Sequence, residues 1–213
     1  MLTATVVDYG VGNLFSVRAA LEHCGVDKVI FAKTASEIIE ADRLILPGVG
    51  AFLDGMNGLR DRSLIDPIMT YVRTGKPLMG ICLGMQMLGS ESNEFGIHEG
   101  LNLIPGRVIK MASHDNNGTR RKVPFVGWAE LNINRSIEFQ SSILSDLSNQ
   151  SAVYLVHSYH FVADNESNVL ANYDYDGLQV CAAIQYENII GLQFHPEKSS
   201  LVGLDILKSF LST

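Results

Sequence analysis

The stretch Gly80-Ile81-Cys82-Leu83-Gly84 places one cysteine between two glycines at the end of an apolar run. The residues before it predict a short buried strand, and Met85-Gln86-Met87-Leu88 after it predicts the first turn of a helix. A residue at such a junction sits in a tight turn with its side chain exposed, and the glycines let neighbouring backbone pass closely. The helix N-terminus also favours thiolate over thiol. The pattern indicates a nucleophile elbow; the competing interpretation is a buried structural cysteine.

The first hundred residues alternate between strand and helix patterns. Asn13 and Gly25 have the residue types that begin and end a helix between them. Apolar strands without polar alternation, separated by helices, predict a parallel sheet covered by helices on both faces. Such a sheet binds ligands beyond the carboxyl ends of its strands, where Asp8-Tyr9-Gly10, Pro47-Gly48-Val49-Gly50 and Cys82 fall. The predicted strands are 5–8, 29–31, 44–46 and 76–79, and the helices are 14–24, a short one from 36, and two around 56–59 and 65–72.

From about residue 103 the pattern changes to strands joined by turns. Strands at 108–111, 153–156, 169–171 and 179–184 predict a mixed or antiparallel extension of the sheet. The polar stretch 113–119 predicts a mobile surface loop. A last strand at 189–194 leads to His195, and an amphipathic helix follows at 201–211. Because no repeat or linker interrupts the chain, we expect one α/β domain over residues 1–213.

The composition bounds the function classes. Hydrophobic content of 46% and charged content of 18% over 213 residues are typical of a soluble globular protein. The net charge of -7 argues against a nucleic-acid-binding surface. No apolar run reaches the roughly 18 residues that span a bilayer, and the N-terminus lacks the pattern of a signal peptide. Three widely spaced cysteines do not suggest a disulfide framework, so we expect a reducing cytoplasm.

A cysteine nucleophile needs a base and a group that orients the base, and Phe194-His195-Pro196-Glu197 offers both. The proline biases His195 toward an extended conformation, so the side chains of His195 and Glu197 are expected on one side. A packing role is the alternative for a histidine after a strand. His157 and His160 also lie near a strand end, and we expect them to shape a pocket or support packing.

Acyl chemistry also needs donors for a developing oxyanion. The N–H of Leu83, the first after the nucleophile, is one candidate. Val49 and Gly50 are a second, because flanking glycines let the peptide between them point inward or flip away. An ordinary strand-ending turn is the alternative for that segment.

Together these segments resemble the class I (triad-type) glutamine amidotransferases, and more closely the glutaminase subunit of imidazole glycerol phosphate synthase. The similarity runs through nearly the whole chain and implies a flavodoxin-like α/β fold without metal or cofactor. The segments that carry it are Asp8-Tyr9-Gly10-Val11-Gly12-Asn13-Leu14, Pro47-Gly48-Val49-Gly50-Ala51-Phe52, Gly80-Ile81-Cys82-Leu83-Gly84-Met85-Gln86, Val156-His157-Ser158-Tyr159 and Gln193-Phe194-His195-Pro196-Glu197-Lys198-Ser199.

By that resemblance Cys82 attacks the side-chain amide of L-glutamine, His195 moves the protons and Glu197 orients His195. A γ-glutamyl thioester forms, ammonia leaves, and water releases glutamate. The positions that match glutamine-holding residues of relatives are Gln86, Glu94, Ser158 and Tyr159. An exposed helix residue is the alternative for Gln86, and a solvated loop charge is the alternative for Glu94.

The resemblance also implies a partner, a (β/α)8 barrel cyclase that uses the ammonia to make imidazole glycerol phosphate in histidine biosynthesis. In relatives the glutaminase is weak until the barrel docks with its substrate, and Val49 and Gly50 would be the switch. Positions expected to face the barrel are Asn13, Trp128, Tyr154 and Lys198. Core packing is the alternative for Trp128, the only tryptophan.

One segment departs from the resemblance. Relatives devoted to histidine synthesis usually carry Pro-His-Met-Gly-Trp-Asn where this chain has Pro124-Phe125-Val126-Gly127-Trp128-Ala129. Phe125 and Ala129 would remove polar groups from a partner-facing region, so a paralogue that supplies ammonia for amidination of a cell-surface sugar is the alternative. A non-catalytic binding domain, or a cysteine peptidase or esterase, are further alternatives from other classes.

Overall fold

The computed structural model describes residues 1–115, 117–135 and 142–213. Its main sheet has eight strands in the order β2-β1-β3-β4-β14-β13-β12-β9. The pairings from β2 through β14 are parallel, and β13, β12 and β9 continue the sheet in antiparallel fashion. The strands are β1 (Thr3–Val7), β2 (Lys28–Ala32), β3 (Leu44–Gly48), β4 (Leu78–Cys82), β9 (Asn132–Ile133), β12 (Val169–Tyr175), β13 (Leu178–Tyr186) and β14 (Ile189–Leu192).

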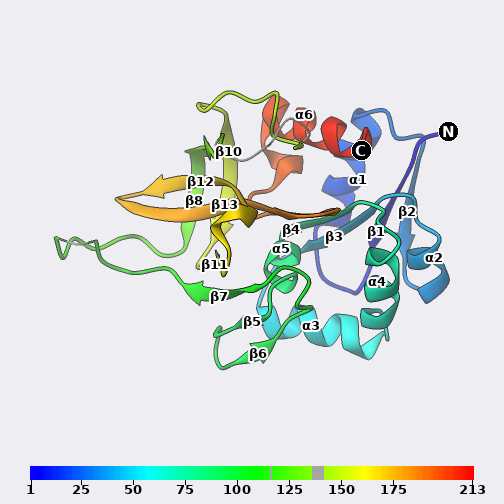
Figure 1. The fold of residues 1–213 in the computed structure, drawn as a ribbon, viewed down its shortest axis with the longest axis horizontal. Helices are drawn as coiled ribbons and strands as arrows, with labels where there is room; N and C mark the ends of the chain where they lie inside the picture. The colour runs from blue at the N-terminus through cyan, green and yellow to red at the C-terminus, as the bar shows by residue number, and fades with distance from the viewer. Residues whose placement is uncertain (116, 136–141) are drawn as a thin grey trace.

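Helices cover both faces of the parallel part of this sheet, as the sequence predicts (Figure 1). Helices α1 and α6 pack on one face, where Leu21 and Phe210 join a fully buried cluster. Helices α2, α3 and α4 pack on the other face, where Ile38, Leu59 and Tyr71 are fully buried. The helices are α1 (Leu14–His23), α2 (Ala35–Ile39), α3 (Phe52–Asp61), α4 (Ile65–Val72), α5 (Leu83–Met87) and α6 (Ser200–Leu211).

The ends of α1 follow from its sequence. The side chain of Asn13 accepts a hydrogen bond from the Ser16 N–H, which confirms its predicted place before the first turn. Gly25 follows the helix with φ +94°, a conformation that glycine adopts without steric cost. Its N–H donates to the Glu22 carbonyl, which closes the helix.

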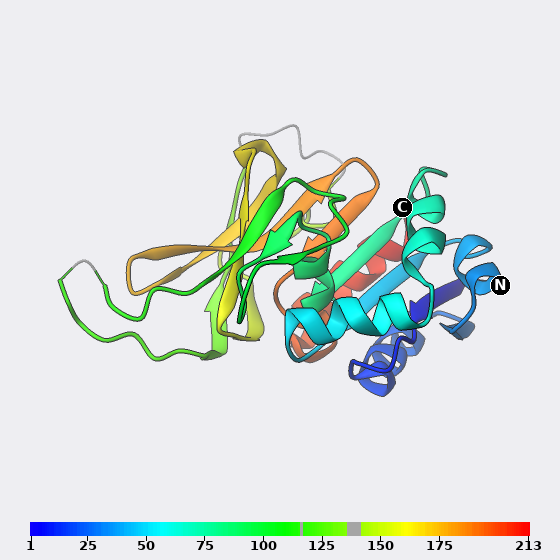
Figure 2. The same ribbon diagram turned by 90° about the horizontal axis from the view of Figure 1, so that it is seen from below.

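The strands of the second half of the chain are distributed over more sheets than the sequence predicts. The strands at 108–111 and 153–156 exist, but they do not extend the main sheet. They belong to two smaller sheets, ordered β11-β7-β5-β6 and β10-β8 (Figure 2). Sequence patterning gives the strands at 108–111 and 153–156 but neither their partners nor the other strands of these two sheets, because pairing is decided by contacts between distant segments. These strands are β5 (Glu91–Ser92), β6 (His98–Glu99), β7 (Gly106–Lys110), β8 (Phe125–Glu130), β10 (Ala152–His157) and β11 (Tyr159–Ala163).

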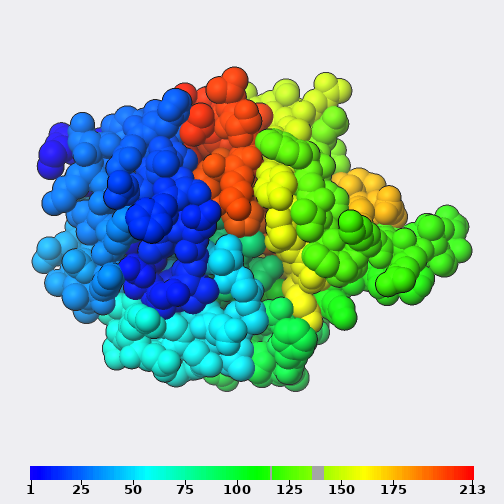
Figure 3. All heavy atoms as spheres, turned by 180° about the vertical axis from the view of Figure 1, so that it is seen from behind, coloured from blue at the N-terminus to red at the C-terminus, as the bar shows by residue number. Residues whose placement is uncertain are grey.

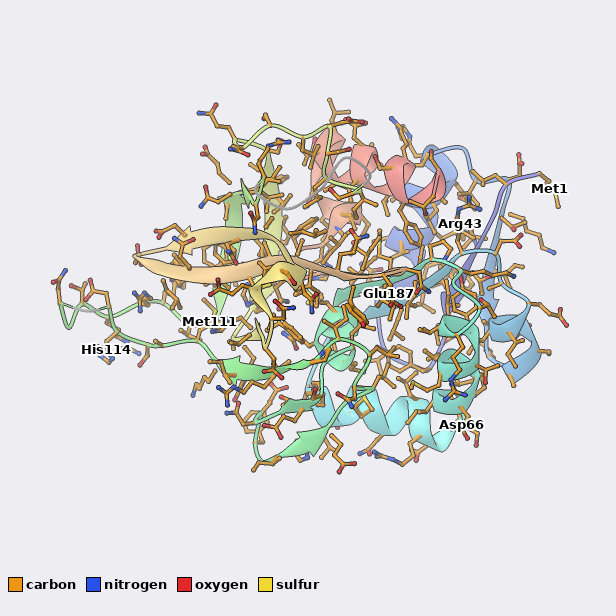
Figure 4. The ribbon with its side chains drawn as sticks, viewed as in Figure 1. Met1, Arg43, Asp66, Met111, His114 and Glu187 are labelled. Carbon is orange, nitrogen blue, oxygen red and sulfur yellow. The ribbon has the colours of Figure 1, made fainter. Side chains whose placement is uncertain are left out.

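The predicted surface loop at 113–119 belongs to an arm that extends away from the sheets, with His114 near its end and Met111 at its base (Figure 4). Arg121, only 5% exposed, fixes the arm. Its guanidinium donates to the carbonyls of His114, Tyr175 and Asp176. Asn116 lies outside the described residues, and the mobility of the loop stays a prediction.

Two further observations concern the whole chain. Cys24, Cys82 and Cys181 are all unpaired. Within the described ranges, none of the helices combines the length and the apolar character that crossing a lipid bilayer requires.

Candidate active site

Cys82 stands at the last position of β4, directly before α5, with φ 55° and ψ −109°. This left-handed conformation is unusual for a residue with a β-carbon and is typical of functional turns. The flanking glycines are required by close packing. A β-carbon on Gly84 would overlap the Leu46 carbonyl of β3, and one on Gly80 would come within 2.8 Å of the Gly84 backbone. The predicted strand–turn–helix junction is therefore present, with Cys82 at the turn.

His195 follows β14 in an extended conformation, with φ −97° and ψ 97°. Its N–H donates to the Tyr154 carbonyl at 3.0 Å, which fixes the backbone. Its Nδ1 lies 2.8 Å from Oε1 of Glu197, and both side chains are almost fully buried. Glu197 reaches the ring from a short 3-10 turn, η2 (Pro196–Lys198), rather than by alternation along a strand. Because an ionised carboxylate only accepts, Nδ1 carries the proton and Nε2 is left for another partner.

The partner of His195 is Cys82. Burial by itself lowers the pKa of His195, but hydrogen bonds to Cys82 and Glu197 and the charges of both groups raise the pKa to about 10. The imidazolium form is thus favoured at neutral pH. An imidazolium beside sulfur stabilises a thiolate, the reactive form of cysteine.

A cavity of about 370 Å³ opens beside this pair. Figure 3 shows the face that carries it, where the cyan segment after β3, the yellow segment of β10 and β11 and the orange segment after β14 surround a hollow. Most of the residues that the sequence singles out line the cavity. They are Val49, Gly50, Cys82, Leu83, Gln86, Glu94, Ser158, Tyr159, His195 and Lys198.

Gln86 and Glu94 approach the cavity from two elements. Gln86 is only 6% exposed, so the alternative of an exposed helix residue is wrong. Its Nε2 donates to the Tyr159 carbonyl at 3.1 Å and to Oε1 of Gln193 at 3.0 Å. Oε2 of Glu94 accepts from the Phe52 N–H at 2.7 Å, at the start of α3. Glu94 is therefore tied to the segment that follows Gly50 rather than being a solvated loop charge.

The segment Pro47 to Gly50 is fixed at one end. The Tyr9 hydroxyl, fully buried, donates to the Pro47 carbonyl at 2.7 Å. Beyond that point Val49 is 40% exposed. Gly50 has φ +104°, with open space where a β-carbon would lie. Pro47 and Gly48 are thus held by Tyr9 and by the pairing of β3 with β4, while Val49 and Gly50 border the cavity.

His157 and His160 have structural surroundings, as the sequence predicts. Nδ1 of His157 lies 2.9 Å from the Tyr159 carbonyl, and Nε2 lies 2.8 Å from the Tyr173 hydroxyl. Both ring nitrogens are therefore occupied, and burial lowers the pKa of His157 to about 4. His160 is buried and lines a different cavity, away from Cys82. His157 also lines the cavity beside Cys82, but both of its ring nitrogens face Tyr159 and Tyr173 instead of the sulfur.

The predicted partner-facing residues are at the surface. Trp128 is 53% exposed, so the core-packing alternative is wrong. It faces Tyr154 across the β8–β10 pair, with ring centroids 5.9 Å apart, and shares a surface hollow with Lys198. Asn13 is exposed at the start of α1.

Phe125 and Ala129 lie on a different face of their strand from the one that the sequence suggests. Along β8 exposed and half-buried residues alternate, so these two lie on the face opposite Trp128. Both pack against the main hydrophobic cluster. Phe125 lies 4.8 Å and 5.2 Å, centroid to centroid, from the rings of Tyr175 and Tyr173. The inference that Phe125 and Ala129 alter the partner-facing surface is wrong, because strand alternation turns both inward.

Sequence reasoning missed Gln193. Its side chain is fully buried, and its Nε2 lies 3.7 Å from Sγ of Cys82. The available signal was its position two residues before His195, because alternate residues of an extended chain share a side.

Comparisons with known proteins agree with this geometry. Residues 5–212 match the family described as glutamine amidotransferase class-I. The chain is 48% identical, over 99% of both chains, to "Imidazole glycerol phosphate synthase subunit HisH 1" of Legionella pneumophila (strain Paris). It is 43% identical, over 99% of its own length and 98% of the relative's, to the HisH subunit of Geobacter metallireducens.

Solved structures show the same fold at lower sequence identity. "Structure of PurLQS from Thermotoga maritima" aligns with a TM-score of 0.73 at 21% identity, over 100% of this chain and 99% of that one. On its family match and its full-length similarity to HisH subunits, the chain belongs to the class I glutamine amidotransferase family.

Proposed function

We propose that this chain is the glutaminase subunit of an imidazole glycerol phosphate synthase. It hydrolyses L-glutamine to glutamate and ammonia and passes the ammonia to a (β/α)8 barrel cyclase, with which it forms a heterodimeric lyase. The observation that carries the proposal is that Cys82 and His195 line one cavity, while Glu197 holds the His195 ring through its Nδ1 at 2.8 Å. The names of the HisH relatives support the pathway. We propose a reducing cytoplasm as the compartment, because the nucleophile must stay an unpaired thiol.

The reaction follows from the charges in the site. The Cys82 thiolate attacks the carbon of the glutamine side-chain amide, and the carbonyl oxygen becomes an oxyanion. His195, as imidazolium, gives its proton to the amide nitrogen, which leaves as ammonia and creates the γ-glutamyl thioester. Neutral His195 then takes a proton from water, the hydroxide attacks the thioester, and glutamate leaves. The thiolate–imidazolium pair is restored, and Glu197 keeps the ring oriented throughout.

Donors for the oxyanion are proposed from two places. The Leu83 N–H opens α5, and a helix N-terminus stabilises negative charge. The second donor is a peptide N–H of the Val49–Gly50 segment. Because Gly50 tolerates either sign of φ, this peptide can turn when the barrel docks. The proposed docking surface contains Asn13, Trp128, Tyr154 and Lys198.

The hydrogen bonds that Gln86 and Glu94 already make within the protein limit which of their atoms can contact the substrate. Both N–H groups of the Gln86 amide are used, so only its Oε1 can face a ligand. Oε2 of Glu94 is bound to Phe52, which leaves Oε1. Two oxygen acceptors fit the α-ammonium group of glutamine. Ser158 and Tyr159 line the same cavity and would hold the other end of the amino acid.

The sugar-amidinating paralogue loses its support. That alternative rested on Phe125 and Ala129 at the partner-facing surface, and both lie on the inward face of β8.

The test follows glutamate release from glutamine by the purified chain, alone and with the cyclase subunit and its substrate. We expect weak release alone and stimulated release in the complex. Cys82→Ala should abolish glutamine-dependent turnover of the complex, while added ammonium still supports the cyclase. Activity on a peptide or ester but not on glutamine would show that the acyl substrate is wrong. Undiminished glutamine-dependent turnover in Cys82→Ala would show that Cys82 is not the nucleophile.

A further inference from the structure

Gln193 places a fully buried amide beside the sulfur of the elbow. Gln193 directly follows β14, and its backbone N–H donates to the Ala182 carbonyl of β13 at 2.9 Å. The backbone of Gln193 is therefore held by the main sheet. Its Nε2 lies 3.7 Å from Sγ of Cys82. The same short segment therefore brings two groups to the sulfur, the His195 ring and the Gln193 amide.

The orientation of this amide is set by a chain of hydrogen bonds that begins at a backbone group. The Tyr159 carbonyl can only accept, so the Gln86 side chain must turn its NH₂ group toward it, at 3.1 Å. The second hydrogen of that NH₂ points to Gln193 at 3.0 Å, where only an oxygen can receive it. Oε1 of Gln193 therefore faces Gln86, and its NH₂ group faces Cys82.

The sulfur also has an unfavourable neighbour for its charged form. Sγ lies 3.9 Å from the Val156 carbonyl oxygen, which can accept a hydrogen bond from the thiol but repels a thiolate. The Val156 carbonyl therefore favours the neutral thiol. The N–H of the Gln193 side chain favours the thiolate instead, because hydrogen bonds to an ionised group are stronger than those to a neutral one.

We infer that Gln193 stabilises and positions the Cys82 thiolate, and that Gln86 keeps the Gln193 amide in the orientation this requires. Gln193 is thus a further functional residue of the proposed glutaminase, on which the inference rests. Gln86 would then have two tasks. Its Oε1 would bind the substrate, and its NH₂ group would orient the Gln193 amide toward Cys82.

The experiment measures how fast iodoacetamide alkylates Cys82 as a function of pH, with Cys82→Ala as the blank for the other cysteines. Gln193→Met keeps the volume but removes the donor. Gln193→Glu keeps an oxygen for Gln86 and places a carboxylate beside the sulfur. We expect the midpoint of the alkylation profile to move up by about one pH unit in Gln193→Met and further in Gln193→Glu. The alkylation rate near pH 7 should fall about tenfold or more.

Gln179→Met is the matched control, because this exposed glutamine of β13 donates to Asp174 instead. Its profile should coincide with that of the parent. Folding of each variant is checked by circular dichroism at every pH, because an unfolded fraction would react as a free cysteine. A parent-like midpoint in either folded Gln193 variant overturns the inference. Glutamine hydrolysis by the parent is tested separately, so an inactive parent with a shifted Gln193 profile would reject the proposed function alone.

Discussion

Cys82, the proposed nucleophile, occupies a backbone conformation that its side chain disfavours. A residue with a β-carbon at φ 55° costs about 1–2 kcal/mol relative to ordinary conformations. The cost is sustained because β4 and α5 pack too closely for another path, as the missing space at Gly80 and Gly84 shows. In return Sγ reaches the cavity, where it meets His195 and Gln193. Local strain and function thus coincide at Cys82.

At the same scale, the charge state of His195 makes stability depend on pH. Glu197→Gln removes the anion but keeps the size of the side chain, so the raised pKa of His195 should fall. In the parent this pKa lies above the ordinary value of 6.5, at about 10, so the charged ring adds stability that is complete below pH 6.5 and lost as the pH rises toward 10. One proton accounts for at most about 1.4 kcal/mol per pH unit.

Urea unfolding of both proteins between about pH 5.5 and 10 measures this difference. The parent should be the more stable at low pH, and the gap should narrow as the pH rises. A gap that stays constant or widens would show that Glu197 does not hold the proton on His195.

At the scale of elements, the junction of β3, β4 and α5 positions the nucleophile. β3 and β4 are parallel neighbours in register, with Gly48 opposite Cys82. The proposed oxyanion segment after β3 and the proposed nucleophile at the end of β4 therefore emerge side by side at one edge of the sheet. His195 arrives at the same edge, because β14 is the parallel neighbour on the other side of β4.

This packing predicts the outcome of adding one methyl group. Gly84→Ala should cost about 3 kcal/mol or more, or prevent folding, because the added carbon meets the rigid backbone of β3. Gly75→Ala is the control, since its β-carbon meets nothing within 4 Å and only its φ of +76° opposes it. That change should cost about 1 kcal/mol. Thermal unfolding compares the two, and equal losses would show that α5 can move away from β3.

At the scale of the molecule, the two-stranded sheet of β8 and β10 carries exposed aromatic side chains. Trp128 and Tyr154 lie exposed or half-exposed near the active-site cavity, with Lys198 beside them. Large exposed aromatic side chains such as Trp and Tyr are typical of protein interfaces. The surface beside the cavity is therefore suited to a partner that receives the ammonia directly.

Trp128→Ala tests this surface. We expect the free energy of unfolding to change by less than about 1 kcal/mol, because the ring is half-exposed, while affinity for the cyclase falls about tenfold or more. Tyr186→Ala is the control, because Tyr186 is similarly exposed, at 43%. It pairs with Ile189 at the start of β14, and therefore lies at the end of the sheet opposite Cys82. Titration calorimetry gives the affinities. Equal losses in both variants, or none in Trp128→Ala, would contradict the proposed interface.

Much of this protein follows from local sequence. The elbow at Cys82 is predictable because the glycine spacing and the change from strand to helix occur within ten residues. The first four parallel strands are predictable for the same reason, since each apolar run is separated from the next by a helix. His195 and Glu197 lie two residues apart, so a contact between them needs little long-range information.

Other features depend on contacts between distant residues. The amide of Gln193 meets a sulfur 111 positions away, and its orientation depends on Gln86 and a carbonyl in another sheet. The inward direction of Phe125 follows from the pairing of β8 with β10, which the apolar pattern alone does not give. The sequence by itself determined the parallel core and the candidates for the nucleophile and its base, because those are properties of short segments. Only the tertiary structure decided the surroundings of the sulfur and the faces of the later strands, because strand pairing and buried hydrogen bonds join segments that are far apart in the chain.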